Sequence, residues 1–155
     1  MNIQVAKSNH QQAISECVVA AYSMYMERMG KKPAPMVTDY TEFISKGLVH
    51  VAVDREELKG LIVLIPKTNY LLIENVAVHP SFQGQGIARE LIEFGIEFAR
   101  KANFKEVCLY TNELMTENLK YYPKFGFIEV DRRIEDGFFS KVYYDIATLL
   151  ANNPE

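Results

Sequence analysis

Residues 76–88 read Val-Ala-Val-His-Pro-Ser-Phe-Gln-Gly-Gln-Gly-Ile-Ala. This order predicts a strand, a proline turn and the start of a helix. The first backbone N–H groups of a helix have no intrahelical partner, and the peptide dipoles leave a partial positive charge there. Gly84 and Gly86 lack the Cβ atoms that would hold a bulky anion away from these amides. The stretch therefore predicts a site for a phosphorylated ligand.

Size and composition favour a single domain over residues 1–155. The chain has 155 residues, 48% of them hydrophobic, which is enough for one substantial core. Its net charge of −3 argues against general binding to nucleic acid or to a membrane surface. No apolar run approaches the roughly 20 residues that cross a bilayer, and the first residues resemble no signal peptide. We expect a cytoplasmic protein.

The cysteines and histidines do not suggest a metal centre. Cys17 and Cys108 stand alone among apolar residues, which is typical of buried thiols in a reducing compartment. His10, His50 and His79 lie far apart in the sequence and without other ligands at metal spacing. We expect neither a disulfide nor a metal.

The rest of the chain alternates between helical and strand periods, which predicts a mixed α/β fold. We expect helices over residues 8–29, 38–47, 85–102 and 116–125, and strands over 48–53, 61–65, 70–78, 107–110, 127–134 and 138–146. A loop at 30–35 separates the first two helices, Gly60 lies beside the turn of the first hairpin, and Asp136-Gly137 turns the last one. The third helix has an apolar stripe of Ile87, Leu91, Gly95, Phe98 and Ala102. It would connect strand 70–78 to a parallel neighbour at 107–110.

Two common phosphate motifs do not fit. A Rossmann fingerprint needs a third glycine where this chain has Arg89, and a side chain there would disturb helix packing. A P-loop ends in Gly-Lys-Ser or Gly-Lys-Thr, whereas Gly86 is followed by Ile87.

The stretch resembles the central motif of the GNAT superfamily of acyl-CoA-dependent N-acyltransferases. That motif has Gln or Arg, two residues, Gly, one residue, then Gly or Ala, and here Gln83, Gly86 and Ala88 match it. A second family signature, an Asn followed by an aromatic pair and Gly-Phe, is similar to residues 118–127, Asn-Leu-Lys-Tyr-Tyr-Pro-Lys-Phe-Gly-Phe. The two motifs stand in the expected order and at the expected separation.

The resemblance implies a fold, a cosubstrate and its contacts. The fold would be a mixed, largely antiparallel central sheet with a splayed parallel strand pair and about four flanking helices. Acetyl-CoA would bind with its pyrophosphate on the amides of Gln83, Gly84, Gln85, Gly86, Ile87, Ala88 and Arg89, and its pantetheine beside Val76, Ala77 and Val78. Asn118 would bond to the pantetheine or phosphate region, although helix capping explains it as well. Arg89 would meet a phosphate oxygen or stay solvated.

The resemblance also implies an N-acetyltransferase acting by direct transfer to a primary amine, without a metal or a covalent intermediate on Cys108. Tyr122 would protonate the departing thiolate, with Tyr121 as the competing candidate and Pro123 as a departure from the common pattern. Glu74, two residues before Val76, would be the base, or else a strand carboxylate paired with a surface cation. Asn112 would act on the acceptor side or simply form a turn.

The acceptor and the partners are less defined by the sequence. Aromatic and methionine residues near the first two helices would form core or line a groove, framed also by the last hairpin, for a small or peptide amine: Tyr22, Tyr25, Met26, Met29, Met36 and Tyr40. A non-catalytic acyl-CoA-binding module is the alternative function. A homodimer would form through an exposed strand edge in the final hairpin, at Phe138, Phe139, Tyr143 and Tyr144.

Overall fold

The computed structural model describes residues 1–134 and 140–148. The strands are β1 (Asn2–Val5), β2 (Val49–Asp54), β3 (Glu57–Pro66), β4 (Leu71–Val78), β5 (Glu106–Asn112), β6 (Ile128–Ile134) and β7 (Ser140–Ala147). The helices are α1 (Gln11–Met29), α2 (Ala34–Val37), α3 (Thr41–Ser45), α4 (Ile87–Lys101) and α5 (Thr116–Tyr121). Short 3-10 turns precede α1, precede α4 and follow α5.

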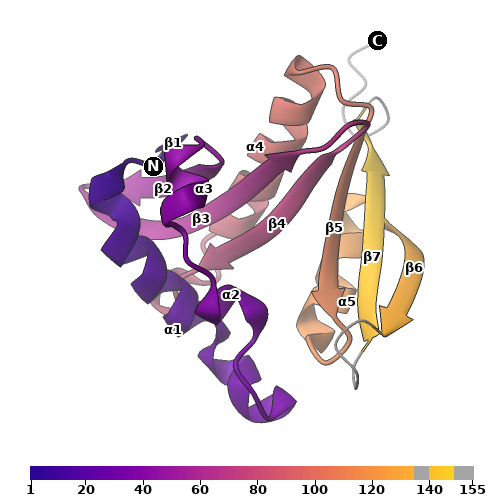
Figure 1. The fold of residues 1–155 in the computed structure, drawn as a ribbon, viewed down its shortest axis with the longest axis horizontal. Coiled ribbons are helices and arrows are strands. Elements are labelled where there is room, and N and C mark those ends of the chain that lie inside the picture. The colour runs from indigo at the N-terminus through magenta and orange to yellow at the C-terminus, as the bar shows by residue number, and fades with distance from the viewer. Residues whose placement is uncertain (135–139, 149–155) are drawn as a thin grey trace. The chain divides into compact units, whose positions relative to one another are not determined.

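The strands form a seven-stranded mixed sheet in the order β1-β2-β3-β4-β5-β7-β6. β1 and β2 are antiparallel, as are β2 and β3, β5 and β7, and β6 and β7. β4 and β5 are parallel, with Leu71 opposite Val107 and Ile73 opposite Leu109. The predicted mixed α/β class and the parallel pair at the two ends of α4 are confirmed (Figure 1).

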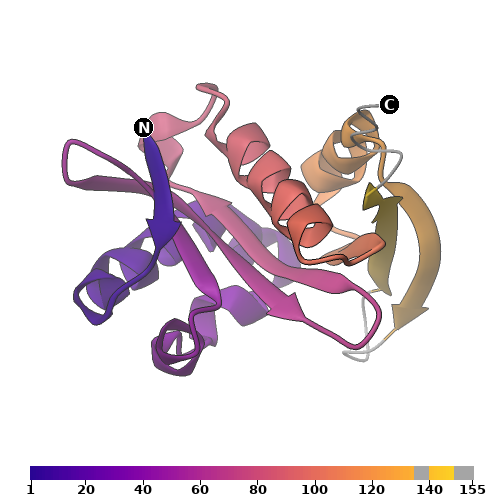
Figure 2. The same ribbon diagram turned by 90° about the horizontal axis from the view of Figure 1, so that it is seen from above.

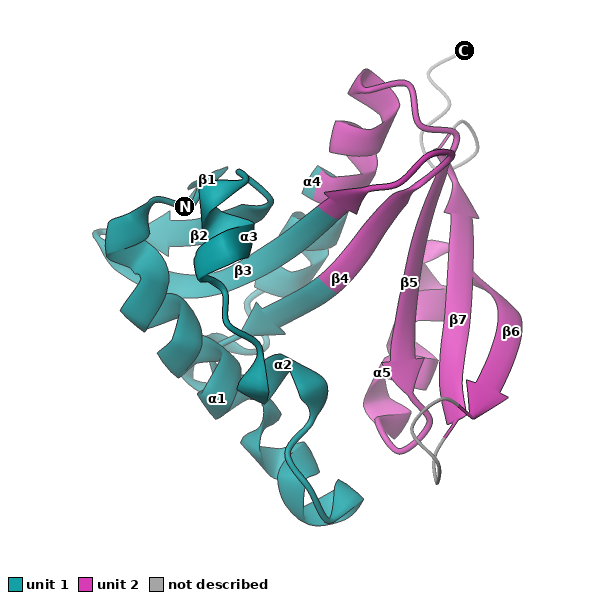
Figure 3. Ribbon diagram, in the orientation of Figure 1, with its two compact units in different colours: residues 1–64, 75–94 teal, residues 65–74, 95–155 magenta. Residues whose placement is uncertain are grey.

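The chain divides into two compact units that interleave in sequence (Figure 3). Unit 1 contains residues 1–64 and 75–94, and unit 2 contains residues 65–74 and 95–155. Strand β4 and helix α4 each contribute one half to each unit. The expectation of a single domain over residues 1–155 stays a prediction.

In unit 1, helix α1 and the first half of α4 lie on opposite faces of the strands (Figures 1 and 2). On the α1 face, Cys17 lies close enough to the backbone of His79, at the end of β4, to hydrogen-bond with it. On the α4 face, the ring of Phe94 lies 4.8 Å from that of His50 on β2. Val51 and Leu61, between the two layers, are fully buried. The core of unit 1 therefore positions the turn that joins β4 to α4.

Gly60 lies within a strand and not beside the hairpin turn, which corrects the sequence analysis. The turn is made by Arg55 and Glu56, which adopt φ of 54° and 67°. Gly60 belongs to β3 and pairs with Ala52 of β2. A Cβ atom on Gly60 would lie 2.8 Å from the carbonyl oxygen of Ala77 on β4. Glycine is required here by the close approach of a neighbouring strand, not by a turn.

In unit 2, β7 lies between β5 and β6, so the strand with Tyr143 and Tyr144 is not a sheet edge. The edge strand is β6, where Ile128 and Ile134 are 68% and 67% exposed. The sequence predicts the exposed edge at Tyr143 and Tyr144, because a hairpin alone does not show which of its strands pairs with β5. The turn at 136–137 and the residues Phe138 and Phe139 lie outside the described part of the chain.

Several element boundaries differ from the expected ones. Helix α2 begins inside the loop predicted for residues 30–35, because proline fits well at the first helical positions. The last predicted helix ends as α5 at Tyr121 and continues as a 3-10 turn that contains Pro123. On α4 the buried face also includes Ile92 and Ile96, whereas Ala102 is exposed beyond the helix end. Among the described residues, no helix has the length and apolar character needed to cross a membrane.

Replacing Gly60 by alanine is expected to destabilise the protein by about 1–3 kcal/mol, because the added methyl group meets a strand carbonyl that cannot move aside. The measurement is chemical denaturation followed by circular dichroism. Glu57→Ala, an exposed position on the same strand, is the control and should change stability by less than about 0.5 kcal/mol. Equal midpoints for Gly60→Ala and the parent would contradict the packing argument.

The free energy of unfolding is expected to fall as the pH drops below 6.5. Burial lowers the pKa of His50 from its ordinary value of 6.5. Between the two pKa values the unfolded chain binds a proton at this position that the folded chain does not, so acid favours unfolding. Denaturation of the parent and of His50→Gln at pH 7.5 and pH 5 measures the effect. The parent should lose more stability than the variant, and equal losses would contradict this origin.

Candidate functional site

The turn between β4 and α4 has the geometry of an anion site. Gly84 and Gly86 adopt φ of +82° and +80°, the left-handed region that side chains rarely occupy. A Cβ atom built on either glycine would have no neighbour within 4 Å among the described residues, so the space over the turn is open. Gln83, Gly84, Gln85 and Gly86 are all exposed. The backbone of this turn is therefore accessible to a bulky ligand.

The first turn of α4 presents its amides to the same space. The first helical hydrogen bond runs from the N–H of Glu90 to the carbonyl of Gly86, at 3.1 Å. The N–H groups of Ile87 and Ala88 precede this bond, and the first N–H groups of a helix have no carbonyl one turn earlier to pair with. With the positive end of the helix dipole, they make a cradle that attracts an anion without a lysine.

Contacts in unit 1 hold the turn in place. His79 accepts a hydrogen bond through Nδ1 from the N–H of Ser81, at 3.1 Å, and donates its own N–H to the carbonyl of Lys59, at 2.9 Å. The ammonium group of Lys59 lies 4.6 Å from the centre of the Phe82 ring. Of the three strand residues proposed beside the pantetheine, Ala77 is buried, and Val76 and Val78 are half-buried.

Arg89 pairs within its own helix. Its guanidinium lies 3.8 Å from the carboxylate of Glu93, and both side chains are 58% exposed. A pair this exposed contributes little to stability and is easily exchanged for another anion. The structure gives Arg89 an ion pair within α4, and its proposed phosphate contact stays a prediction.

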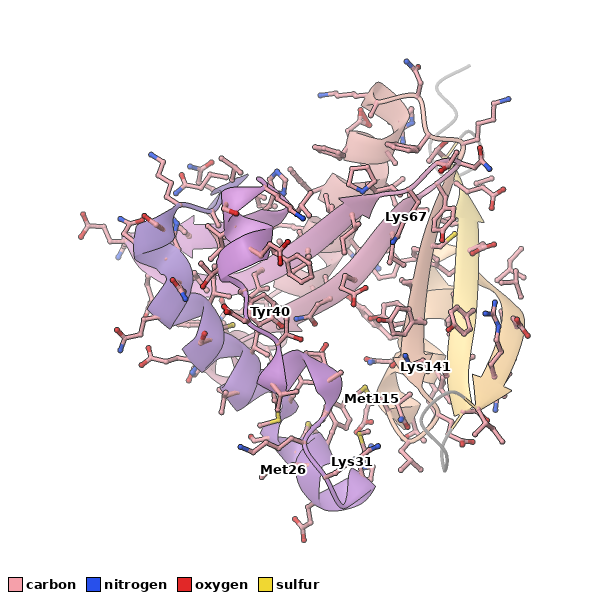
Figure 4. The ribbon with its side chains drawn as sticks, viewed as in Figure 1. Met26, Lys31, Tyr40, Lys67, Met115 and Lys141 are labelled. Carbon is pink, nitrogen blue, oxygen red and sulfur yellow. The ribbon has the colours of Figure 1, made fainter. Side chains whose placement is uncertain are left out.

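Asn118 of α5 uses its side-chain amide inside unit 2. Nδ2 donates to Oγ1 of Thr111 at 3.1 Å and lies 3.7 Å from the sulfur of Met115. Thr111 and Met115 are buried, and Figure 4 labels Met115 next to the start of α5. The expected roles of Asn118 were a bond to the cosubstrate or helix capping, and neither includes this bond to Thr111, which joins α5 to β5. Asn112 accepts a hydrogen bond through Oδ1 from the N–H of Leu114, as its turn alternative predicts.

The two tyrosines at the end of α5 have different surroundings. Tyr122 is only 8% exposed, with ring centres of Phe127 and Tyr144 each 6.0 Å away. Tyr121 is half-buried and packs edge-on against Phe125, with ring centres 5.1 Å apart. Neighbouring helical residues point about 100° apart, so the two hydroxyl groups have different environments.

Glu74 accepts a hydrogen bond from a tyrosine that the sequence analysis did not single out. The hydroxyl of Tyr110 on β5 donates to Oε1 of Glu74 at 2.9 Å. The ring of Tyr110 lies 5.6 Å from that of Tyr143, and the ammonium group of Lys141 lies 4.8 Å from its centre (Lys141 is labelled in Figure 4). Glu74 is thus not an isolated surface carboxylate. The sequence predicts that β4 and β5 are parallel neighbours, and this pairing could have indicated Tyr110 on β5 as a partner of Glu74 on β4.

Tyr122 and Glu74 lie on opposite faces of the unit 2 strands. Tyr122 packs against Tyr144 of β7, whereas Glu74 bonds to Tyr110, which stacks near Tyr143. Tyr143 and Tyr144 are consecutive in a strand, so their side chains point to opposite faces. A ligand that meets both groups must therefore pass through the plane of the sheet.

Comparisons with known proteins agree with this fold and turn. A family model described as the acetyltransferase (GNAT) family matches residues 15–127, which include the turn, Glu74, Tyr110 and Tyr122. The chain belongs to the GNAT acetyltransferase family. The resemblance of the two motifs is thereby confirmed.

The relatives of this GNAT chain include proteins from bacteria and a mammal. It is 31% identical over 104 residues to an uncharacterized N-acetyltransferase, YvbK, of Bacillus subtilis (strain 168), over 66% of this chain and 65% of that protein. It is 26% identical over 110 residues to N-acetyltransferase family 8 member 3 of Rattus norvegicus, over 67% of this chain and 44% of that protein. The match thus spans less than two thirds of either relative's length.

A solved structure shows the same fold. The PaiA N-acetyltransferase from Thermoplasma acidophilum, crystallised in complex with coenzyme A, matches with a TM-score of 0.76 and 16% identity. The match covers 92% of this chain and 96% of that one.

The thiols of this GNAT chain are poor nucleophiles. Burial raises the pKa of Cys17 to about 11, although a hydrogen bond with the backbone of His79 lowers this pKa in part. Burial, and then a hydrogen bond from the thiol to Asp145, raise the pKa of Cys108 well above its usual range. The potential ligand atoms of Glu106, Cys108 and Asp145 lie within 4.8 Å of one another. The sequence did not predict this group, because Asp145 lies on β7 and the other two residues lie on β5. A thiol that keeps its proton is a weak nucleophile toward a thioester.

The aromatic and methionine residues of α1 and the following segment divide between core and surface. Tyr25, Met29 and Tyr40 are buried, which is half of the six residues that helical spacing predicted to be mostly core. Tyr22 and Met36 are half-buried, and Met26 is 38% exposed. Figure 4 labels Met26 on α1 and Tyr40 in the segment before α3.

Proposed function

We propose that this chain is an N-acetyltransferase that transfers the acetyl group of acetyl-CoA directly to a primary amine. The observation that carries the proposal is the turn at Gly84 and Gly86, whose left-handed backbone opens onto the first amides of α4 in a chain of the GNAT family. A phosphorylated cosubstrate suits this cradle, and acetyl-CoA supplies the activated acetyl group when it is bound.

The residues present fit coenzyme A. The diphosphate would accept hydrogen bonds from the amides between Gln83 and Arg89, in the space that a Cβ on Gly84 or Gly86 would enter. The backbone of residues 76–78 would hold the amides of the pantetheine arm, as one strand holds another. Asn118 would act indirectly, because its amide bonds to Thr111 and thereby fixes α5.

Two side chains would handle the protons of the transfer. Glu74 would take a proton from the amine, and Tyr122 would give one to the departing thiolate. Their positions on opposite faces of the unit 2 strands support a division of work between an acceptor face and a thiol face. Tyr122 is preferred to Tyr121 for the acid because its buried ring is held by Phe127 and Tyr144.

The acceptor would be a small amine or a peptide amine with an apolar part. Tyr22, Met26 and Met36 keep part of their surface accessible in unit 1 and would contact such a group.

We further propose a cytoplasmic homodimer. The edge strand β6, with Ile128 and Ile134 exposed, replaces the β7 positions as its contact surface.

Tyr122→Phe and Glu74→Gln should each lower the kcat of acetyl transfer by about 100-fold or more, the usual contribution of a general acid or base. Binding of acetyl-CoA should change little in both variants. The measurement is release of free thiol from acetyl-CoA with a panel of alkylamines, amino acid amides and short peptides. Full activity in both variants would refute the assigned roles. Tight binding of acetyl-CoA with no acceptor acetylated would instead favour the non-catalytic module.

Gly86→Ala should weaken the binding of coenzyme A by about tenfold or more. The methyl group enters the space of the diphosphate, and the left-handed backbone becomes unfavourable. Gly30→Ala is the matched control. Gly30 has a similar φ of +73° and no atom within 4 Å of its Cβ position, but it lies at the end of α1 and outside the turn. Titration calorimetry should show an unchanged affinity for the control. Equal affinities in all three proteins would remove the diphosphate from this turn.

A further inference from the structure

We propose that Tyr110 is a positioning residue that holds the Glu74 carboxylate in the orientation needed to accept the proton of the amine. This inference rests on the proposed function, and it assigns a role to a residue outside both family motifs. Its starting point is the hydrogen bond of 2.9 Å from the Tyr110 hydroxyl to Oε1 of Glu74.

The bond is directional and leaves one oxygen for the reaction. A glutamate side chain has several rotatable bonds, so a carboxylate without a partner samples many positions. Tyr110 engages Oε1, which leaves Oε2 to accept the proton of the incoming ammonium group. The bond from a phenol to an ionised carboxylate is stronger than a bond between neutral groups, so it holds the carboxylate in one orientation.

Tyr110 is itself held from several sides, so its hydroxyl has little freedom. It lies directly opposite Tyr143 in the antiparallel register of β5 and β7, with ring centres 5.6 Å apart. The ammonium group of Lys141 lies 4.8 Å from the Tyr110 ring, and the guanidinium of Arg133 on β6 lies 4.4 Å from the Tyr143 ring. A row of five side chains in unit 2 thus takes one member from each of β4, β5 and β6 and two members, Tyr143 and Lys141, from β7.

The row also explains why a tyrosine suits this position. Each ring carries its negative face toward a cation, and cation–π contacts of this kind are worth most when water is partly excluded. The other four side chains of the row are half-buried: Glu74, Tyr110, Lys141 and Tyr143. A phenylalanine at position 110 would keep both ring contacts and lose only the donor to Glu74. The two contributions can therefore be separated by a single substitution.

The test uses Tyr110→Phe, Glu74→Gln and the double variant, with Tyr143→Phe as the matched control that removes a hydroxyl from the neighbouring ring. Acetyl-CoA and the best acceptor from the amine panel serve as substrates. Tyr110→Phe should lower kcat by about tenfold while the KM for acetyl-CoA and the thermal midpoint stay near those of the parent. In Glu74→Gln, the added Tyr110→Phe change should have no further effect on kcat.

The outcomes separate the two proposals. A parent that acetylates amines, with Tyr110→Phe as active as the parent, would overturn the role of Tyr110 and leave the proposed function intact. A parent that acetylates no amine would overturn the proposed function, and the role of Tyr110 with it. Equal further losses from Tyr110→Phe in the presence and absence of Glu74 would show that Tyr110 acts independently of Glu74, which also overturns the inference.

Discussion

The left-handed backbone at Gly84 and Gly86 is the constraint on which the rest of the structure depends. It lets α4 begin directly after the turn, with Glu90 N–H as the first helical donor. Starting the helix one residue later would rotate its faces by about 100°. Ile87 and Leu91, which lie 3.3 and 3.2 Å from the Cβ position of Gly60, would then lose their place against β3. The turn that exposes the amides therefore also sets the packing of α4 in unit 1.

The alternation of side chains along β7 separates the two proposed proton carriers. Tyr144 is 2% exposed beneath the aromatic rings that follow α5, and burial raises its pKa. Tyr143, one residue earlier, belongs to the row that reaches Glu74 through Tyr110. Because strand geometry places Tyr143 and Tyr144 on opposite faces, the proposed acid Tyr122 and the proposed base Glu74 also lie on opposite faces.

The sequence predicted what depends on local patterns and missed what depends on pairing between distant strands. The glycine turn, the parallel strands around α4 and the helix that ends near Pro123 follow from local rules, and the structure contains them. Gly60 was misplaced because the carbonyl of Ala77 that excludes a side chain there comes from another strand. Tyr110 was missed because its partner Glu74 lies 36 residues away. The insertion of β7 between β5 and β6 likewise has no signal in a hairpin's own residues.

Asn75 shows how a polar side chain inside unit 1 links the helices to the strand that carries the proposed cosubstrate site. Its side chain accepts from the hydroxyl of Tyr22 at 2.5 Å and donates to the hydroxyl of Tyr40 at 2.9 Å, and the residue is only 6% exposed. A buried amide without hydrogen-bond partners would destabilise the folded state. The two bonds of Asn75 therefore stabilise the position of Tyr22 and Tyr40 on β4. Tyr40 in turn donates to the carbonyl of Pro35 in α2. Tyr22 and Tyr40, which the sequence assigned to core or groove, thus hold α1 and the segment before α3 against β4.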